Sequence, residues 1–158
     1  IDKRITEVGE IYISNYYQAV DKETKEFLKN KIAPIIGQEI KKVIPNVSNI
    51  MPPQLMRFSP GSFLRMHVDD YAGEAGYTIF INDGWKWDYG GILSFISNYG
   101  DTSLPIFPEN NLGIIRDESK KSFHFVSQQT DYCSADQYLL VGWASEQKKH
   151  NKFDYLPI

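Results

Sequence analysis

The stretch that most constrains the fold begins at residue 54, where short strand-like segments alternate with turn signals up to about residue 145. The segments are rich in β-branched and aromatic residues, which favour strands, and clusters of Gly, Pro, Asn and Asp separate them. They read QLMRFS, SFLRMHV, GYTIFIN, GGILSFIS, NLGII, SFHFVS and QYLLVGWAS. Short strands in series, without helical segments between them, predict an antiparallel sandwich or barrel, most simply a jelly roll.

A helical segment precedes these strands. From Asp21 onward, apolar residues recur at the three- and four-residue spacing of one helix face. They are Phe27, Leu28, Ile32, Ile35, Ile36, Ile40, Val43 and Ile44. Pro34 and Gly37 interrupt the pattern, which therefore predicts two helices or one kinked helix. We expect a single, mainly β domain over residues 1–158, with helical support over about residues 1–50 and a jelly-roll core over about residues 54–145.

Charge and cysteine content limit the partners and the compartment. The formal net charge is −3, so nothing marks the chain as a binder of nucleic-acid backbones. No apolar run approaches the length that spans a bilayer, and no signal-peptide pattern opens the chain. Cys133 is the one cysteine, which is compatible with a reducing compartment. We expect a cytoplasmic protein without a nucleic-acid or membrane partner; its oligomeric state, and any segment before Ile1, are left open.

His67 and Asp69 form the first part of a predicted metal site. Residues i and i+2 of a strand face the same side, so an imidazole nitrogen and a carboxylate oxygen can converge there. Two histidines and one carboxylate make the facial arrangement that leaves coordination positions open on iron(II). His124 lies in the strand-like SFHFVS, whereas His150 lies in a polar tail, so His124 is the predicted third ligand. The alternative is a chance surface pair and a histidine packed in the core between two phenylalanines.

From Leu55 to Ala144, the chain resembles the prolyl-4-hydroxylase-like branch of the 2-oxoglutarate and iron(II)-dependent dioxygenases. The similar segments occur in the family's order: MRFSPGSFLRMHVDD, TIFIND, GWKWDYGGILSF, NNLGIIRDESKKSFHFVSQQ and QYLLVGWA. The resemblance implies a double-stranded β-helix whose metal ligands and catalytic residues are His67, Asp69 and His124. It implies iron(II) as cofactor and 2-oxoglutarate as cosubstrate, with ascorbate as an optional supporting reductant. The implied activity is hydroxylation of a peptidyl, prolyl-type substrate or of a small molecule.

The chain departs from the family pattern where the cosubstrate is held. The family anchors the distal carboxylate of 2-oxoglutarate with an Arg or Lys on the strand after the distal histidine. The same register places Gln137 there, and it places Phe58 and Phe80 where some relatives have tyrosines. A neutral amide binds a carboxylate more weakly than a charged donor does. Either the cosubstrate pocket is rewired or lost relative to the family, or the strand aligns with the family in another register.

A substitute cation is available on the neighbouring strands. Arg116 follows the segment NLGII, which the resemblance places along the pocket wall, and it is our first choice, with Gln137 as a helper. Arg65 is the second choice because it shares the strand parity of His67. Arg57 is a further candidate, and for each of these arginines the alternative is a solvated side chain. If none serves, the chain is a non-catalytic metal- or ligand-binding jelly roll, or an iron oxygenase with a different cosubstrate.

Aromatic residues near the metal motif form the last feature of interest. Trp85 and Trp87 follow the turn at residues 82–84, and Tyr71 and Tyr77 flank the small-residue stretch AGEAG. The resemblance implies that loops in these places cover the active site and contact the substrate. The alternative is that these rings pack the rim of the jelly roll. The sequence does not identify the substrate.

Overall fold

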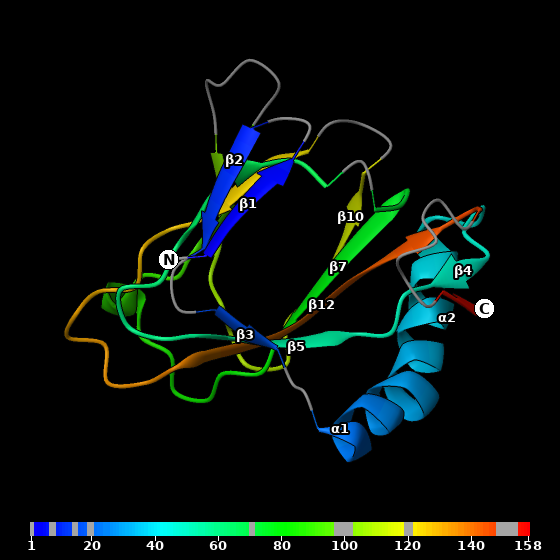
Figure 1. The fold of residues 1–158 in the computed structure, drawn as a ribbon, viewed down its shortest axis with the longest axis horizontal. Helices are drawn as coiled ribbons and strands as arrows, with labels where there is room; N and C mark the ends of the chain where they lie inside the picture. Colours follow the sequence, from blue (N-terminus) through cyan, green and yellow to red (C-terminus); the bar gives the residue numbers. More distant parts are fainter. Residues whose placement is uncertain are drawn as a thin grey trace.

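The computed structural model describes residues 2–6, 9–13, 16–18, 21–69, 72–96, 103–118, 122–147 and 155–158, and it is mainly β (Figure 1). The strands are β1 (Asp2–Thr6), β2 (Gly9–Ile13), β3 (Tyr16–Gln18), β4 (Asn49–Ile50), β5 (Gln54–Phe58), β6 (Leu64–His67), β7 (Ala75–Phe80), β8 (Leu93–Ile96), β9 (Ser103–Ile106), β10 (Gly113–Asp117), β11 (Phe123–Val126), β12 (Gln137–Ser145) and β13 (Leu156–Pro157). The helices are α1 (Lys22–Phe27), the π-helical turn η1 (Leu28–Ile32), α2 (Ala33–Val43) and the 3-10 turn η2 (Trp87–Tyr89).

The strands form two antiparallel sheets. One has the order β1-β2-β6-β11-β8-β9, and the other has the order β10-β7-β12-β4-β13, with β5 paired to β12 and β3 paired to β5. From β5 to β12 the chain passes repeatedly from one sheet to the other, because β5, β7, β10 and β12 belong to one and β6, β8, β9 and β11 to the other. This alternation confirms the predicted jelly roll.

A core cluster joins the inner faces of the two sheets. Phe58, Phe80 and Leu139 come from one sheet, and Leu93 and Val126 come from the other; all are buried. Burying aromatic and branched side chains between two sheets removes apolar surface from water, at about 25 cal/mol for each Å². This cluster therefore holds the two sheets together.

The helical run packs on the second sheet. Ala33, Ile36 and Ile40 of α2 are buried in one cluster with Ala75 and Tyr77 of β7. The α2 helix lies beside β4 and the C-terminal end of the chain (Figure 1). The helical layer therefore supports the sheet from outside.

Pro34 and Gly37, which were predicted to interrupt the helix, affect it differently. Pro34 lies in the first turn of α2, where its missing N–H is tolerated, and the π-helical turn η1 directly precedes α2. The wider turn follows from Pro34, because proline cannot donate to the carbonyl four residues earlier and its ring crowds that carbonyl. Gly37 does not interrupt α2: it lies inside the helix, where a Cβ would collide with Ile158.

The predicted bounds of the helical support need correction at the N-terminus. Residues 2–6, 9–13 and 16–18 form strands β1, β2 and β3, so the helical run covers only residues 22–43 of the first 50. The segments DKRIT, GEIYI and YYQ are rich in Ile, Thr and Tyr, which favour strands. The β2 strand pairs with β6 and so extends the sheet that carries the metal motif.

All seven predicted strand segments form strands: β5, β6, β7, β8, β10, β11 and β12. The strand β9 was missed because Pro105 interrupts its pattern; it lies at the edge of its sheet, where a missing N–H costs little. Within the part of the chain that the structure describes, no helix is long and apolar enough to cross a membrane.

Candidate metal centre

His67 and His124 lie opposite each other on neighbouring strands. His67 ends β6, and His124 in β11 is its direct antiparallel partner. Side chains of such cross-strand partners are close neighbours on one face of a sheet. The two imidazole centroids are 4.2 Å apart, with the rings tilted by 53°. Strand pairing alone therefore brings together two predicted ligands that are far apart in the sequence.

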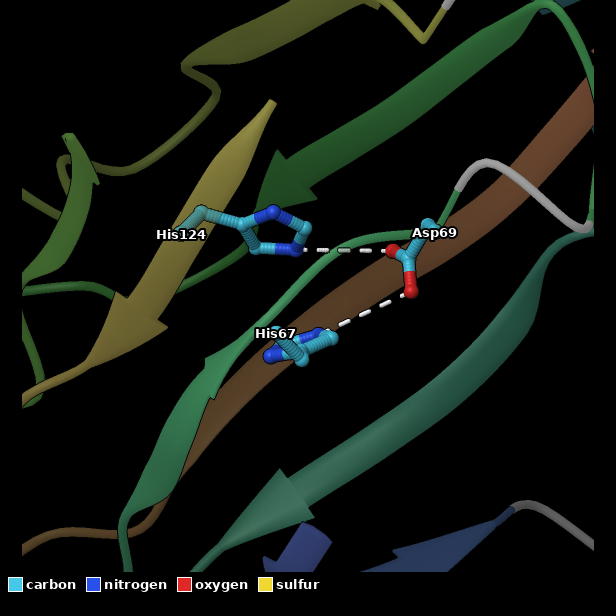
Figure 2. A group of neighbouring side chains, drawn as sticks. All are labelled: His67, Asp69 and His124. Carbon is cyan, nitrogen blue, oxygen red and sulfur yellow. Dashed lines mark ion pairs between the residues drawn. The ribbon is translucent and has the colours of Figure 1, made fainter. Parts of the chain in front are cut away.

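Asp69 completes the group from the segment that follows β6 (Figure 2). Its Oδ1 lies 3.6 Å from Nε2 of His67, and its Oδ2 lies 3.4 Å from Nε2 of His124. One potential ligand atom from each of the three residues lies within 4.8 Å of the others, and all three residues are more than nine-tenths buried. The parity argument thus holds in space, although β6 ends at His67 and Asp69 lies just beyond it.

Backbone carbonyls fix the orientation of both imidazoles. Nδ1 of His67 lies 2.7 Å from the carbonyl oxygen of Arg65, and Nδ1 of His124 lies 2.9 Å from that of Ser122. A carbonyl oxygen only accepts, so each Nδ1 carries the hydrogen and donates it. In a neutral ring, Nε2 is then the acceptor, and both Nε2 atoms face Asp69. Histidines that bind metals are commonly oriented in this way.

The electrostatics of the group favour a neutral His67 and an ionised Asp69. Burial, followed by the proximity of His124, lowers the pKa of His67 to about 4. Burial also opposes ionisation of Asp69, but its contacts with His124 and His67 and the charge of Arg116 outweigh burial and hold its pKa well below the usual range. At neutral pH, Nε2 of His67 and Oδ1 of Asp69 are therefore two acceptors that face each other. A cation between them would satisfy both.

Arg116 of β10 is a buried cation in contact with the same group. Its Nη1 lies 3.0 Å from Nε2 of His124, and its Nη2 lies 3.3 Å from Oδ2 of Asp69. Its Nε is 2.9 Å from Oε1 of the buried Glu118, and its charge lies 5.9 Å from the ring centroid of Phe95. The resemblance implied that Arg116 lies along the pocket wall, but the sequence did not reveal this direct contact with the predicted metal ligands.

Gly76 of β7 provides the space for this guanidinium. It is the cross-strand partner of Arg116 in the β10–β7 pair. A Cβ at Gly76 would collide with the guanidinium of Arg116 and with the carboxylate of Glu118. A glycine at this position therefore allows a long charged side chain to lie flat across the neighbouring strand.

The other predicted cosubstrate residues lie elsewhere. Gln137 begins β12, is fully buried, and donates its side-chain amide to the carbonyl oxygen of Gly91 at 2.8 Å. Its cross-strand partner is Phe58 in the apolar core. The side chain of Arg65 is exposed and lines a surface groove of about 360 Å³ together with Met66 and neighbouring residues. The role of each residue toward a cosubstrate stays a prediction.

Besides Glu118, the buried polar side chain of Gln129 was missed by sequence reasoning. Gln129 is 1% exposed, and neither atom of its amide forms a hydrogen bond within the part of the chain that the structure describes. Its Cγ approaches Gly91, as does the amide of Gln137, so two glutamine side chains share one buried region. The only signal in the sequence is a polar Ser-Gln-Gln run directly after β11, which is not distinctive.

The two tryptophans of the predicted loop differ in exposure. Trp85 is buried, donates from Nε1 to the carbonyl oxygen of Gly90 at 3.1 Å, and packs edge-on against Tyr89. Trp87 is 71% exposed and stacks on Phe107 with centroids 4.1 Å apart. Trp85 is thus a structural side chain, and Trp87 is the one available to a ligand.

Three further residues were named in the sequence analysis, Tyr77, Tyr71 and His150, and the structure describes only the first. Tyr77 is buried in the core, and its hydroxyl donates to the carbonyl oxygen of Met51 at 2.9 Å. Burial raises the pKa of Tyr77. Tyr71 and His150 lie outside the described residues.

Comparison with known proteins reveals similarity at the level of structure. No protein-family model and no curated protein matches the chain. A Pseudomonas putida prolyl-4-hydroxylase matches with a TM-score of 0.62 and 16% identity, over 87% of this chain and 72% of that one. A Trichoplax adhaerens prolyl hydroxylase, solved in complex with a peptide fragment of the hypoxia inducible factor oxygen degradation domain, matches with a TM-score of 0.66 and 16% identity, over 87% and 66%.

A third structure extends this similarity. A Burkholderia pseudomallei protein of the 2OG-Fe(II) oxygenase family matches with a TM-score of 0.59 and 16% identity, over 92% of this chain and 70% of that one. Similarity at this identity establishes the fold. The chain therefore shares the fold of the prolyl-4-hydroxylase-like oxygenases, which confirms the resemblance found in its sequence at the level of structure.

Proposed function

We propose that this protein is an iron(II)- and 2-oxoglutarate-dependent oxygenase that hydroxylates a peptidyl, prolyl-type substrate or a small molecule. One observation carries the proposal: His67, Asp69 and His124 direct two imidazole nitrogens and a carboxylate oxygen to one buried point. The fold shared with prolyl-4-hydroxylases and a 2OG-Fe(II) oxygenase-family protein supports the reaction class.

The three side chains fit iron(II). Two histidines and one carboxylate are the ligand set of non-haem iron(II) oxygenases, and they leave positions open for other ligands. Both Nε2 atoms are acceptors because both Nδ1 atoms donate to carbonyls. Asp69 is held ionised and supplies a negative charge where a divalent cation would bind. When bound, iron(II) would supply activation of dioxygen for the oxidation of a substrate C–H bond, with 2-oxoglutarate as the co-reductant.

The protein's own part in this reaction is to position groups and to exclude water. His67 and His124 are held rigid by strand pairing and by their Nδ1 hydrogen bonds. The core cluster that includes Phe58 and Phe80 provides an apolar interior beside Gln137. Trp87, at the surface with Phe107, is the aromatic group that we assign to substrate contact.

Arg116 remains the proposed cation for the distal carboxylate of 2-oxoglutarate. It is a buried cation beside His124 and Asp69, which supports this role. A buried carboxylate without a partner costs several kcal/mol, and Gln137 supplies no charge to offset this cost. Its amide hydrogen bond to Gly91 also engages one of its donors.

A second candidate function follows from Gln137. A glutamine at the family's cationic position favours either an iron oxygenase with a different cosubstrate or a metal-binding jelly roll without catalysis. The two functions differ in one assay: conversion of 2-oxoglutarate to succinate in the presence of iron(II) and oxygen. Turnover supports the oxygenase, whereas metal binding without 2-oxoglutarate binding supports the second candidate.

Anaerobic titration with iron(II) tests the metal centre directly. We expect one ion per chain for the wild type, and loss of this stoichiometric binding in His67→Ala and in His124→Ala. His150→Ala, which changes the remaining histidine, is the matched control and should bind like the wild type. Circular dichroism should show that all variants keep their fold. If both triad variants retain full affinity, the assignment of the metal ligands is wrong.

A further inference from the structure

The guanidinium of Arg116 lies where it competes with a metal for the same atoms. Its Nη1 faces Nε2 of His124 at 3.0 Å, and its Nη2 faces Oδ2 of Asp69 at 3.3 Å. A guanidinium has five N–H donors and no acceptor. Nε2 of His124 must therefore accept this hydrogen bond with its lone pair, which is also the lone pair that a metal would need.

The lone pair on Nε2 of His124 can bind only one partner at a time, either a hydrogen-bond donor or a metal. The Nδ1 of His124 is engaged with the carbonyl oxygen of Ser122, so rotating the ring to offer Nδ1 to a metal would break that bond. Nε2 is hence the only nitrogen of this ring that faces Asp69, and Arg116 holds it. Binding of Arg116 and binding of a metal at His124 are mutually exclusive.

The guanidinium also stabilises the group in the absence of a metal. Asp69 is 5% exposed, and an ionised buried carboxylate needs a cationic partner. Arg116 provides this partner on the side of His124 and Oδ2. On the other side, Nε2 of His67 and Oδ1 of Asp69 face each other at 3.6 Å as two acceptors. A metal would satisfy both sides, whereas the guanidinium satisfies one.

Glu118 offers the guanidinium a second position. Its Oε1 lies 2.9 Å from Nε of Arg116, and its side chain is fully buried. Rotation about the last bonds of Arg116 would withdraw Nη1 and Nη2 from the ligands while Nε stays beside Glu118. The ion pair with Glu118 would then keep the displaced charge partnered.

We propose that Arg116 is an internal cation that closes the metal centre when no metal is bound, and that a metal enters only by displacing it toward Glu118. This proposal rests on the proposed metal site. It makes Arg116 a regulator of metal affinity: the protein exchanges one resident cation for another. The ions concerned are divalent metals that bind imidazole and carboxylate, such as iron(II) and zinc.

Zinc titration of Arg116→Met tests the proposal without turnover. Methionine keeps a long, flexible side chain but has no donor. We expect Arg116→Met to bind zinc with a Kd at least about tenfold lower than that of the wild type, because a charge-assisted hydrogen bond no longer has to be broken. Arg57→Met is the matched control, since Arg57 is also a strand arginine, but it pairs with Asp136 and its side chain is 40% exposed. Its Kd for zinc should equal that of the wild type.

The outcomes separate this proposal from the proposed function. Tighter zinc binding in Arg116→Met alone supports the displacement, and so does binding that is seen only in Arg116→Met. Equal or weaker binding in Arg116→Met, with a wild type that binds zinc, overturns the role of Arg116 and leaves the metal centre intact. No binding in either protein overturns both.

A measurement on the wild type covers the case in which Arg116→Met does not fold. Nitrogen-15 NMR of the metal-free protein should show His124 as a neutral ring protonated at Nδ1, with Nη hydrogens of Arg116 protected from exchange. One equivalent of zinc should shift the His67 and His124 imidazole signals and remove the protection of the Arg116 Nη hydrogens. Imidazole signals that move while the Arg116 signals stay unchanged would refute displacement.

Discussion

The metal-free protein is expected to lose stability between pH 7 and pH 5, and His67 is the predicted cause. Burial, and then the proximity of His124, lowers the pKa of His67 from 6.5 to about 4 in the folded state. In the unfolded chain, the same imidazole binds its proton near the ordinary value. Between these two pKa values the unfolded state holds more protons, so the free energy of unfolding rises with pH across this window and falls as the solution is acidified.

The structure sets the size of this effect. A pKa that differs by about 2.5 between the two states, at about 1.4 kcal/mol per unit, corresponds to about 3 kcal/mol over the whole window. About 2 kcal/mol of this is lost between pH 7 and pH 5, because the unfolded chain is largely protonated at pH 5 and the folded one is not. His67 is 6% exposed, so solvent screening reduces the effect little.

Urea unfolding in the presence of a chelator measures the effect. Unfolding is followed by tryptophan fluorescence at several pH values between 7 and 5, for the wild type and for His67→Gln. Glutamine removes the titrating group, so the wild type should lose about 2 kcal/mol more than the variant over this range. The reasoning is refuted if both proteins lose stability in parallel.

Two further predictions compare matched substitutions. Trp85→Ala should lower the free energy of unfolding by about 3 kcal/mol, because this ring is buried. Trp87→Ala should leave the melting temperature nearly unchanged, because this ring is exposed. It should impair substrate turnover more than uncoupled 2-oxoglutarate consumption. Similar melting temperatures for the two variants would contradict this assignment. Gly76→Ala should cost about 1–3 kcal/mol because its Cβ collides with Arg116, whereas Gly113→Ala on the neighbouring strand has room and should not destabilise. Thermal melts that fail to separate the two glycines would contradict the packing described around Arg116.

The strands of the jelly roll could be predicted because each of them carries its own local signal. The segment SFHFVS has β-branched and aromatic residues, and it forms β11. The strand β9 lacks that signal because Pro105 breaks it, and only pairing with β8 at the edge of the sheet makes it a strand. Tertiary pairing therefore decides where the local pattern is weak.

The arrangement of the candidate metal centre could be predicted only in part. Residues i and i+2 of a strand face the same side, and this rule predicted that His67 and Asp69 lie close together. They do so in the structure, even though β6 ends at His67. The pairing of His124 with His67 is a long-range register, and no pattern in the sequence encodes it. The choice of His124 over His150 rested on a strand-like context rather than on geometry.

The contacts of Arg116 show what lay beyond the sequence. Its strand and its proximity to the pocket could be inferred, but the direction of its guanidinium depends on the missing side chain of Gly76 across the β10–β7 pair. A cross-strand gap is visible only once the register is known. The sequence therefore predicted a cation near a cosubstrate, but it did not predict the contact of that cation with the proposed metal ligands.

The formal charges of Arg116, Asp69 and Glu118 connect the two proposed roles of Arg116. Arg116 contributes one positive charge, and the carboxylates of Asp69 and Glu118 contribute two negative charges, so these three side chains carry one excess negative charge without a metal. A divalent ion would change this to one excess positive charge. A buried charge that is not balanced is costly, so the metal-loaded centre should favour an anionic ligand on the metal. The proposed displacement would thus free the same residue to meet the carboxylate of the proposed cosubstrate.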